Sequence, residues 1–93
     1  MEKLSINGKT FWGYKVPTKN ASLLVITAPN GMLACGYVKV ETADKLKDAV
    51  SIVTGVNSYS DMLSKGVVAV SEEAANMGVE IGMTGKEALL KMS

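Results

Sequence analysis

Alternation of apolar and polar residues predicts antiparallel strands in the first part of the chain. Leu4 and Ile6 alternate with polar neighbours, and Asn7-Gly8 then offers a tight turn into an aromatic-rich strand over residues 10–16. A cluster of turn-forming residues at 17–20 separates this hairpin from a second one. The first forty residues are therefore expected to form a β meander.

The second hairpin consists of two apolar runs, residues 23–28 and 32–40, on either side of Pro29-Asn30-Gly31. The proline favours a type I turn followed by a left-handed Gly31. Because successive residues of a strand point to opposite faces, and neighbouring residues are apolar in both runs, both faces of this hairpin are apolar.

A small antiparallel sheet usually exposes one face to water, so two apolar faces need two covers. The C-terminal half of the chain can cover one face. We expect a second copy of the chain to cover the other, so the protein should be a homo-oligomer assembled through residues 1–40.

From residue 41 the pattern changes to short helices separated by short apolar segments. Helices are expected over residues 43–48 after Thr42, around residues 61–63 after Ser58 or Ser60, from Ser71 to a Schellman-type stop at Gly78-Val79, and from a capping box at Thr84 and Glu87 to Met92. Residues 67–70 resemble a buried strand. Residues 49–53 are ambiguous between helix and strand, and we favour a break near Asp48.

These patterns predict one small α+β domain over residues 1–93. Its antiparallel β region, residues 1–40, precedes a helix-rich region, residues 41–93, that holds one or two extra short strands. The composition, 47% hydrophobic and 20% charged, is that of an ordinary globular domain.

The absence of certain residue types excludes several kinds of site. Histidine is absent, all ten basic residues are lysines, and Cys35 is the single cysteine. Without histidine there is no Ser-His-Asp or Cys-His pair and no imidazole ligand for a metal. One cysteine makes neither an intrachain disulfide nor a multi-thiolate metal site. We therefore expect no metal site and no cofactor.

Charge and hydropathy exclude two classes of partner. The formal net charge is +1, and ten lysines against nine carboxylates scattered along the chain leave no basic stripe for nucleic acid. No apolar run approaches the roughly 20 residues of a bilayer-spanning helix, and the N-terminus shows no apolar segment of a signal peptide. A lone free cysteine fits the reducing cytosol, so a cytoplasmic location is expected.

Cys35, Gly36 and Tyr37 form the candidate site. Cys35 has high intrinsic nucleophilicity, Gly36 allows a ligand to approach the backbone, and Tyr37 can donate a hydrogen bond from the same face of the predicted strand. However, the neighbours of Cys35 are apolar and no histidine activates it. We expect Cys35 to be a buried structural residue. Catalysis by Cys35 with Tyr37, and ligand binding by all three residues, stay open as alternatives.

Asp61 also has two interpretations. A pair with another carboxylate, such as Asp44 or Glu87, would suit acid–base or magnesium chemistry, but no spacing supports such a pair. Asp61 lies three residues after Ser58, and this spacing favours a carboxylate that caps a helix N-terminus.

Four segments make the chain similar to a known family: Cys35-Gly36-Tyr37, Gly55-Val56, Asp61-Met62-Leu63 and residues 82–89. The sequence resembles the YunC-like family, small bacterial and archaeal proteins classed as a domain of unknown function. The resemblance runs from about residue 22 to the C-terminus, and residues 1–20 match only in length and β character. It implies an α+β cytosolic protein whose N-terminal β region mediates assembly, a tetramer being one expected form. It supplies no catalytic residue.

Two functions from different classes follow. The missing catalytic constellations and the two-sided apolar sheet favour a non-catalytic assembly or small-ligand-binding module. The alternative is a thiol-dependent enzyme or redox sensor that uses Cys35.

Overall fold

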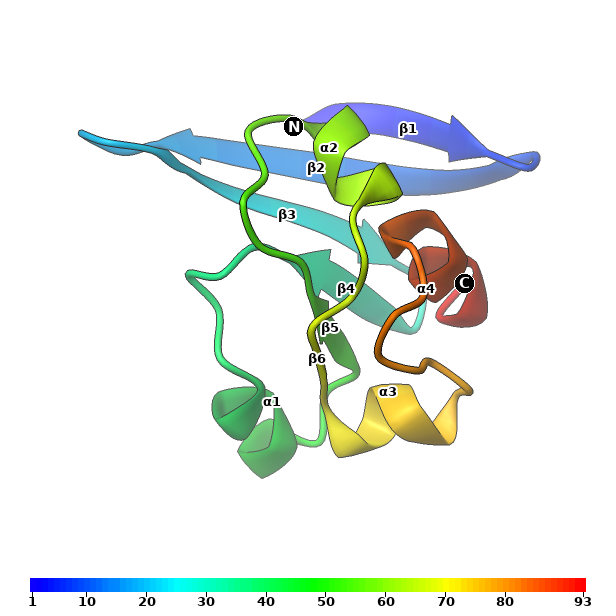
Figure 1. Cartoon of the computed structure of the whole chain (residues 1–93). Helices are drawn as coiled ribbons and strands as arrows, with labels where there is room; N and C mark the ends of the chain where they lie inside the picture. The colour runs from blue at the N-terminus through cyan, green and yellow to red at the C-terminus, as the bar shows by residue number, and fades with distance from the viewer.

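The structure, a computed structural model, describes all residues from 1 to 93. One mixed sheet of six strands is covered by four short helices (Figure 1). The strands are β1 (Glu2–Ile6), β2 (Lys9–Pro17), β3 (Ser22–Ala28), β4 (Gly31–Ala34), β5 (Val50–Ile52) and β6 (Ala69–Val70), and the helices are α1 (Val40–Leu46), α2 (Tyr59–Ser64), α3 (Glu72–Asn76) and α4 (Gly85–Lys91). The α+β class and the antiparallel N-terminal strands are confirmed.

The strands follow one another across the sheet in chain order, and all pairs are antiparallel except β4 and β5. The first turn is the one expected, because Asn7 and Gly8 both have positive φ, 51° and 77°, as a type I′ hairpin requires.

The turn between β3 and β4 differs from the prediction. Ala28 pairs directly with Gly31, and Gly31 is not among the residues with positive φ. The glycine is needed there for packing instead, because a Cβ on Gly31 would lie 2.6 Å from the sulfur of Met92 and 2.8 Å from the carbonyl oxygen of Ala49.

The strand predicted over residues 32–40 is wrong beyond Ala34. After Cys35 the chain turns away from the sheet, and α1 begins at Val40, ahead of the expected cap at Thr42. The N-cap is Lys39, whose side chain makes no capping hydrogen bond. Residues 50–52 then form β5 beside β4, in parallel, so the ambiguous segment is a strand and the break near Asp48 is confirmed.

The larger core lies between the sheet and the helices α2, α3 and α4. The sheet contributes Phe11, Leu24, Ile26 and Leu33, and the helical side contributes chiefly Met62, Ala74, Ala88, Leu89 and Met92, all fully buried. Tyr59 covers Gly13, where its ring carbons come within 2.7 Å of the position of a Cβ. The start of α2 therefore packs directly against β2 at Gly13.

The opposite face of the sheet is covered only in part. A second, smaller core joins Ala43 of α1 to Ala34, Val50 and Ile52. This helix covers the β4–β6 end, so the expectation that the helix-rich region covers one face alone is wrong. At the β1–β3 end, Trp12 is 39% exposed, Tyr14 38% and Val16 55%.

Local capping signals place three helices as predicted. Ser58 accepts a hydrogen bond from the Asp61 amide, and Thr84 and Glu87 form a reciprocal capping box. The Glu87 carboxylate accepts hydrogen bonds from the backbone amide and the side-chain hydroxyl of Thr84. These bonds, the backbone one more than the other, hold the pKa of Glu87 below its ordinary value. Helix α3 ends in the expected Schellman motif, since the Val79 amide donates to the Ala74 carbonyl.

Ser71 connects α3 to the sheet. Its hydroxyl oxygen accepts hydrogen bonds from the amides of Val50 and Ala74, at 2.9 and 3.3 Å, and donates to the carbonyl of Asp48 at 2.8 Å. Asp44 of α1 adds a second link, because its carboxylate accepts from the Glu72 amide at 2.8 Å. These polar links join α1, β5 and α3.

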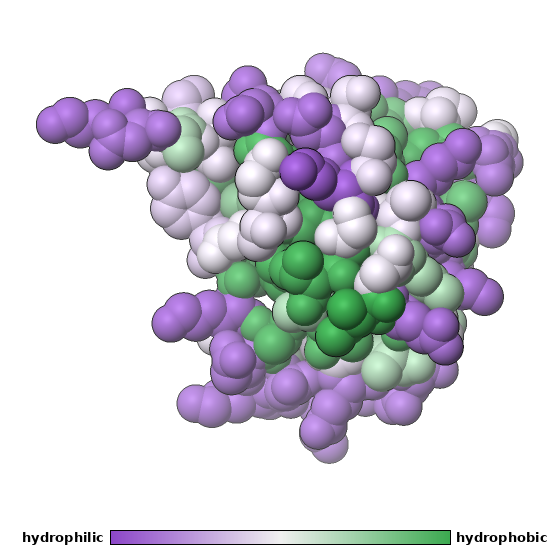
Figure 2. All heavy atoms as spheres, viewed as in Figure 1, coloured by the Kyte–Doolittle hydropathy of each residue, from purple (hydrophilic) through white to green (hydrophobic).

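The predicted strand over residues 67–70 is shorter than expected. Only Ala69 and Val70 pair with β5, and both are half-buried, whereas Val68 is exposed. Figure 2 shows apolar surface near the centre of the view, over β6 and the segment between α3 and α4, where Val68 and Ile81 are exposed. No helix of the chain has the length and apolar character needed to span a membrane.

We predict that Gly85→Ala destabilises the fold by about 3 kcal/mol. A Cβ on Gly85 would collide with the carbonyl oxygen of Met62 and lie 2.7 Å from a methyl carbon of Leu33. The matched control is Gly66→Ala, because the nearest atom to its Cβ position is 3.9 Å away. Urea unfolding should show a large loss for the first variant and little change for the second, and equal losses would contradict this account of the packing.

Candidate functional site

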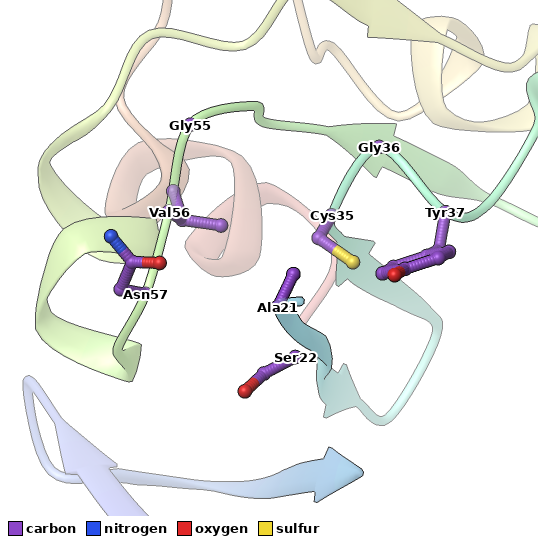
Figure 3. Close-up of a pocket in the computed structure, with 8 residues that line it drawn as sticks. All are labelled: Ala21, Ser22, Cys35, Gly36, Tyr37, Gly55, Val56 and Asn57. Atoms are coloured by element: carbon purple, nitrogen blue, oxygen red, sulfur yellow. The ribbon is translucent and has the colours of Figure 1, made fainter. Parts of the chain in front are cut away.

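A pocket of about 470 Å³ lies where three loops meet (Figure 3). It is lined by Ala21, Ser22, Cys35, Gly36, Tyr37, Gly55, Val56 and Asn57. The first two residues come from the end of the β2–β3 hairpin, the next three follow β4, and the last three follow β5. All three residues of the candidate site therefore line one pocket.

Parallel pairing explains why two of these loops meet. Ala34 pairs with Ile52, and the Val53 amide then donates to the Ala34 carbonyl at 2.9 Å. Because parallel strands end at the same edge of a sheet, the segments after β4 and β5 emerge together, and this edge is where open sheets commonly bind ligands. A Cβ on Gly36 would lie 3.4 Å from the methyl carbon of Thr54, so the loops are in contact.

Cys35 is buried, with 5% of its surface exposed. Its amide donates to the Leu24 carbonyl at 3.0 Å, but its own carbonyl turns away and accepts from the Val38 amide at 3.1 Å. The Leu24 amide donates instead to the Cys35 sulfur at 3.3 Å. The thiol thus takes the place of a carbonyl at the end of β4, which is a structural role within the wall of the pocket.

Tyr37 does not lie on the strand face where the sequence placed it. The strand has already ended, and Tyr37 is 55% exposed in a turn. Its hydroxyl lies 3.2 Å from the hydroxyl of Thr18. The ring therefore bridges the β4–α1 loop and the β2–β3 hairpin.

The third wall begins at Gly55, whose φ of 69° is in the left-handed region. The amide of Asn57 then donates to the Asp61 carboxylate at 3.0 Å, while the Asp61 amide donates to the hydroxyl oxygen of Ser58, the N-cap residue of α2. Asp61 is thus a helix-capping carboxylate, as the spacing favoured. No group of three or more His, Cys, Asp or Glu side chains is placed to hold a metal ion.

No lining side chain carries a carboxylate or an ammonium group. One cation lies close by, because the ammonium nitrogen of Lys65 is 3.8 Å from the position that a Cβ on Gly55 would take. Tyr59, whose pKa is raised, lies outside the pocket lining. Burial is the larger cause of the raised pKa of Tyr59, and the nearby Glu2 carboxylate adds to it.

Five lining residues were not named as site residues from the sequence: Ala21, Ser22, Gly55, Val56 and Asn57. Gly55 and Val56 entered only through the family resemblance. A strand–helix–strand reading of residues 32–53 would have indicated them, because it places the segment after residue 53 beside Cys35.

The chain is similar in sequence to two known proteins, and in fold to one of them. Over 93 aligned residues the chain is 28% identical to the uncharacterized protein YunC of Bacillus subtilis (strain 168), and the alignment covers 96% of this chain and 92% of that protein. The crystal structure of TA1206 from Thermoplasma acidophilum, a protein of unknown function, matches with a TM-score of 0.94 and 35% identity. That match covers 99% of this chain and 90% of TA1206.

The family model of a domain of unknown function, DUF1805, matches residues 34–92. This range begins at the last residue of β4 and includes both loops that follow the parallel strands and all four helices. The chain belongs to the DUF1805 family.

Proposed function

We propose that the protein is a non-catalytic, homo-oligomeric module of the cytosol that binds a small ligand in the pocket between the β4–α1 and β5–α2 loops. The main support for a ligand site is the set of residues that line this pocket. Two loops from the ends of adjacent parallel strands, together with Ala21 and Ser22, line an open pocket of about 470 Å³ without a charged lining side chain. Pockets of this size, apolar with a few polar groups, are typical of small-molecule sites.

The proposed assembly surface is the uncovered sheet face at the β1–β3 end. Register places Trp12 beside Thr27 and Tyr14 beside Val25, so these side chains share one face. The partly exposed aromatic rings suit the core of an interface, where tyrosine and tryptophan are enriched. A second copy is the proposed occupant, because two identical faces can pack on each other and a net charge of +1 opposes this only weakly.

The second candidate function, thiol chemistry at Cys35, is favoured by one contact. The Leu24 amide donates to the sulfur, and such a bond also stabilises a thiolate. Low exposure and the absence of histidine oppose it.

We predict that native Cys35 reacts at least about tenfold more slowly with a soluble aromatic disulfide reagent at neutral pH than the same thiol does in urea, because its sulfur is buried. Cys35→Ser should cost less stability than Cys35→Ala, since only a hydroxyl can still accept from the Leu24 amide. For Cys35→Ala the loss should be about 1–3 kcal/mol. Equal labelling rates in the native and unfolded protein would favour the thiol enzyme or redox sensor.

We predict an oligomer at micromolar concentration in light scattering, and Trp12→Glu should convert it to monomer. A glutamate there faces Lys3 across the β1–β2 pair, so the variant should fold, but a carboxylate at an apolar interface is costly. Val68→Glu, on the other exposed apolar surface, is the control and should leave the oligomer intact. A monomeric wild type contradicts the proposed assembly, as does dissociation caused by Val68→Glu alone.

We predict that fragments from a library of small polar molecules bind the pocket, moving the amide resonances of residues 35–37 and 55–57. Ala21→Trp should weaken such binding at least about tenfold, because a large ring on this lining residue occupies the pocket mouth. Asn20→Trp adds the same ring next to the pocket but outside its lining. If no fragment moves these resonances, or if both variants act alike, the proposed ligand site is wrong.

A further inference from the structure

We infer that the outer end of the β2–β3 hairpin, residues 14–22, is a flap that closes over the pocket, and that the contact between Tyr37 and Thr18 stabilises its closed position. This inference rests on the proposed ligand site and describes how that site opens and closes. It comes from the strand pairing of the hairpin, its exposure and the few contacts that join it to the rest of the chain.

Residues 14–22 form an arm of only two strands. Strand β1 pairs with β2 no further than Gly13, and β4 pairs with β3 no further than Val25. Beyond these points β2 and β3 pair only with each other, up to Pro17 and Ser22. An isolated pair of strands is marginally stable in water. The arm, which Figure 1 shows beyond the rest of the sheet, therefore depends on its contacts with the body for its position.

The arm itself is little packed but keeps its own shape. Every residue from 14 to 21 is exposed, and Ser22 is half-buried. In the turn, the Thr18 amide donates to the Ala21 carbonyl at 2.9 Å, and the Ala21 amide donates to the Thr18 hydroxyl oxygen at 2.9 Å. Because these bonds lie within the tip, a movement of the arm does not break them. The arm can therefore move as one piece.

The base of the arm is fixed on both strands. On β2, the ring of Tyr59 covers Gly13. On β3, Leu23 packs against the larger core, and the next residue, Leu24, exchanges two hydrogen bonds with Cys35, one of them to the sulfur. A movement of the arm must therefore pivot just beyond Gly13 and Leu23.

The arm carries one wall of the pocket. Ala21 and Ser22 belong to it, whereas the other lining residues belong to the loops after β4 and β5 (Figure 3). One side-chain hydrogen bond joins the tip to the body, because the Thr18 and Tyr37 hydroxyls lie 3.2 Å apart at the surface. Movement of the arm changes the width of the pocket, so a ligand that contacts both walls favours the closed position.

Amide relaxation dispersion on the intact protein tests the motion. Residues 18–22 should show exchange on the microsecond-to-millisecond scale of loop closure, whereas Asn7 and Gly8, in the turn of the other hairpin, should show none. A saturating fragment bound in the pocket should suppress the exchange at residues 18–22. If these residues show no exchange in the free protein, or keep it with the fragment bound, the inference is wrong.

Tyr37→Phe tests the contact that stabilises the closed position. It should weaken fragment binding about threefold, chiefly through faster dissociation, because a net hydrogen bond at the surface is lost. Tyr14→Phe is the matched control, because this exposed tyrosine lies on the arm and its hydroxyl has no hydrogen-bond partner within the chain. It should change neither the affinity nor the exchange. Equal effects of the two variants contradict the inference.

A double-mutant cycle separates this role from a direct contact between the Tyr37 hydroxyl and the ligand. Thr18 does not line the pocket. In a Thr18→Val background, Tyr37→Phe should cause no further loss of affinity, because its partner hydroxyl is already absent. A threefold loss in both backgrounds assigns the hydroxyl to the ligand and overturns the flap.

Failure of the flap and failure of the ligand site are distinguishable. If fragments bind in the pocket while residues 18–22 stay rigid, the ligand site stands and only the flap is wrong. If no fragment binds, the proposed ligand site is wrong and closure over a ligand is wrong with it, whatever exchange the free arm shows.

Discussion

The parallel contact between β4 and β5 is the constraint on which the rest of the structure depends. A parallel pair needs a crossover connection, and residues 35–49 supply it through α1. The crossover places α1 on the face opposite α2 and α4, where Ala43 joins the second core. The same pairing brings the loops after both strands to one edge of the sheet. One backbone arrangement therefore produces both the partial cover of the second face and the pocket.

The end of β4 shows how a buried residue with a structural contact comes to line the pocket. Where a strand leaves a sheet, backbone groups of the neighbouring strand lose their hydrogen-bond partners. A buried amide left without a partner costs about 1–3 kcal/mol of stability. At this point the Cys35 sulfur accepts a hydrogen bond from the Leu24 amide. The Cys35 carbonyl is therefore free to accept from the Val38 amide in the turn that follows β4. The thiol is thus explained by the geometry of the strand end.

Sequence reasoning succeeded where residues only a few positions apart decide the local conformation. Asn7-Gly8 and the capping box at Thr84 are of this kind, and the structure has both. It failed over residues 32–40, because the pattern is apolar throughout and only the distant segment 50–52 decides where the strand ends. For the site, Cys35, Gly36 and Tyr37 were identifiable as chemistry-bearing neighbours. Their partners Gly55, Val56 and Asn57 join them only through tertiary pairing, which no local pattern contains.

The β2–β3 hairpin connects the uncovered face with the pocket. Figure 1 shows its end reaching beyond the rest of the sheet. Val16 lies on the uncovered face, Thr18 contacts the Tyr37 hydroxyl, and Ser22 lines the pocket. A contact that fixes the position of the end of this hairpin also fixes one wall of the pocket, since both belong to the same short segment. By linkage, any effect of such a contact on ligand affinity is matched by an equal effect of the ligand on that contact.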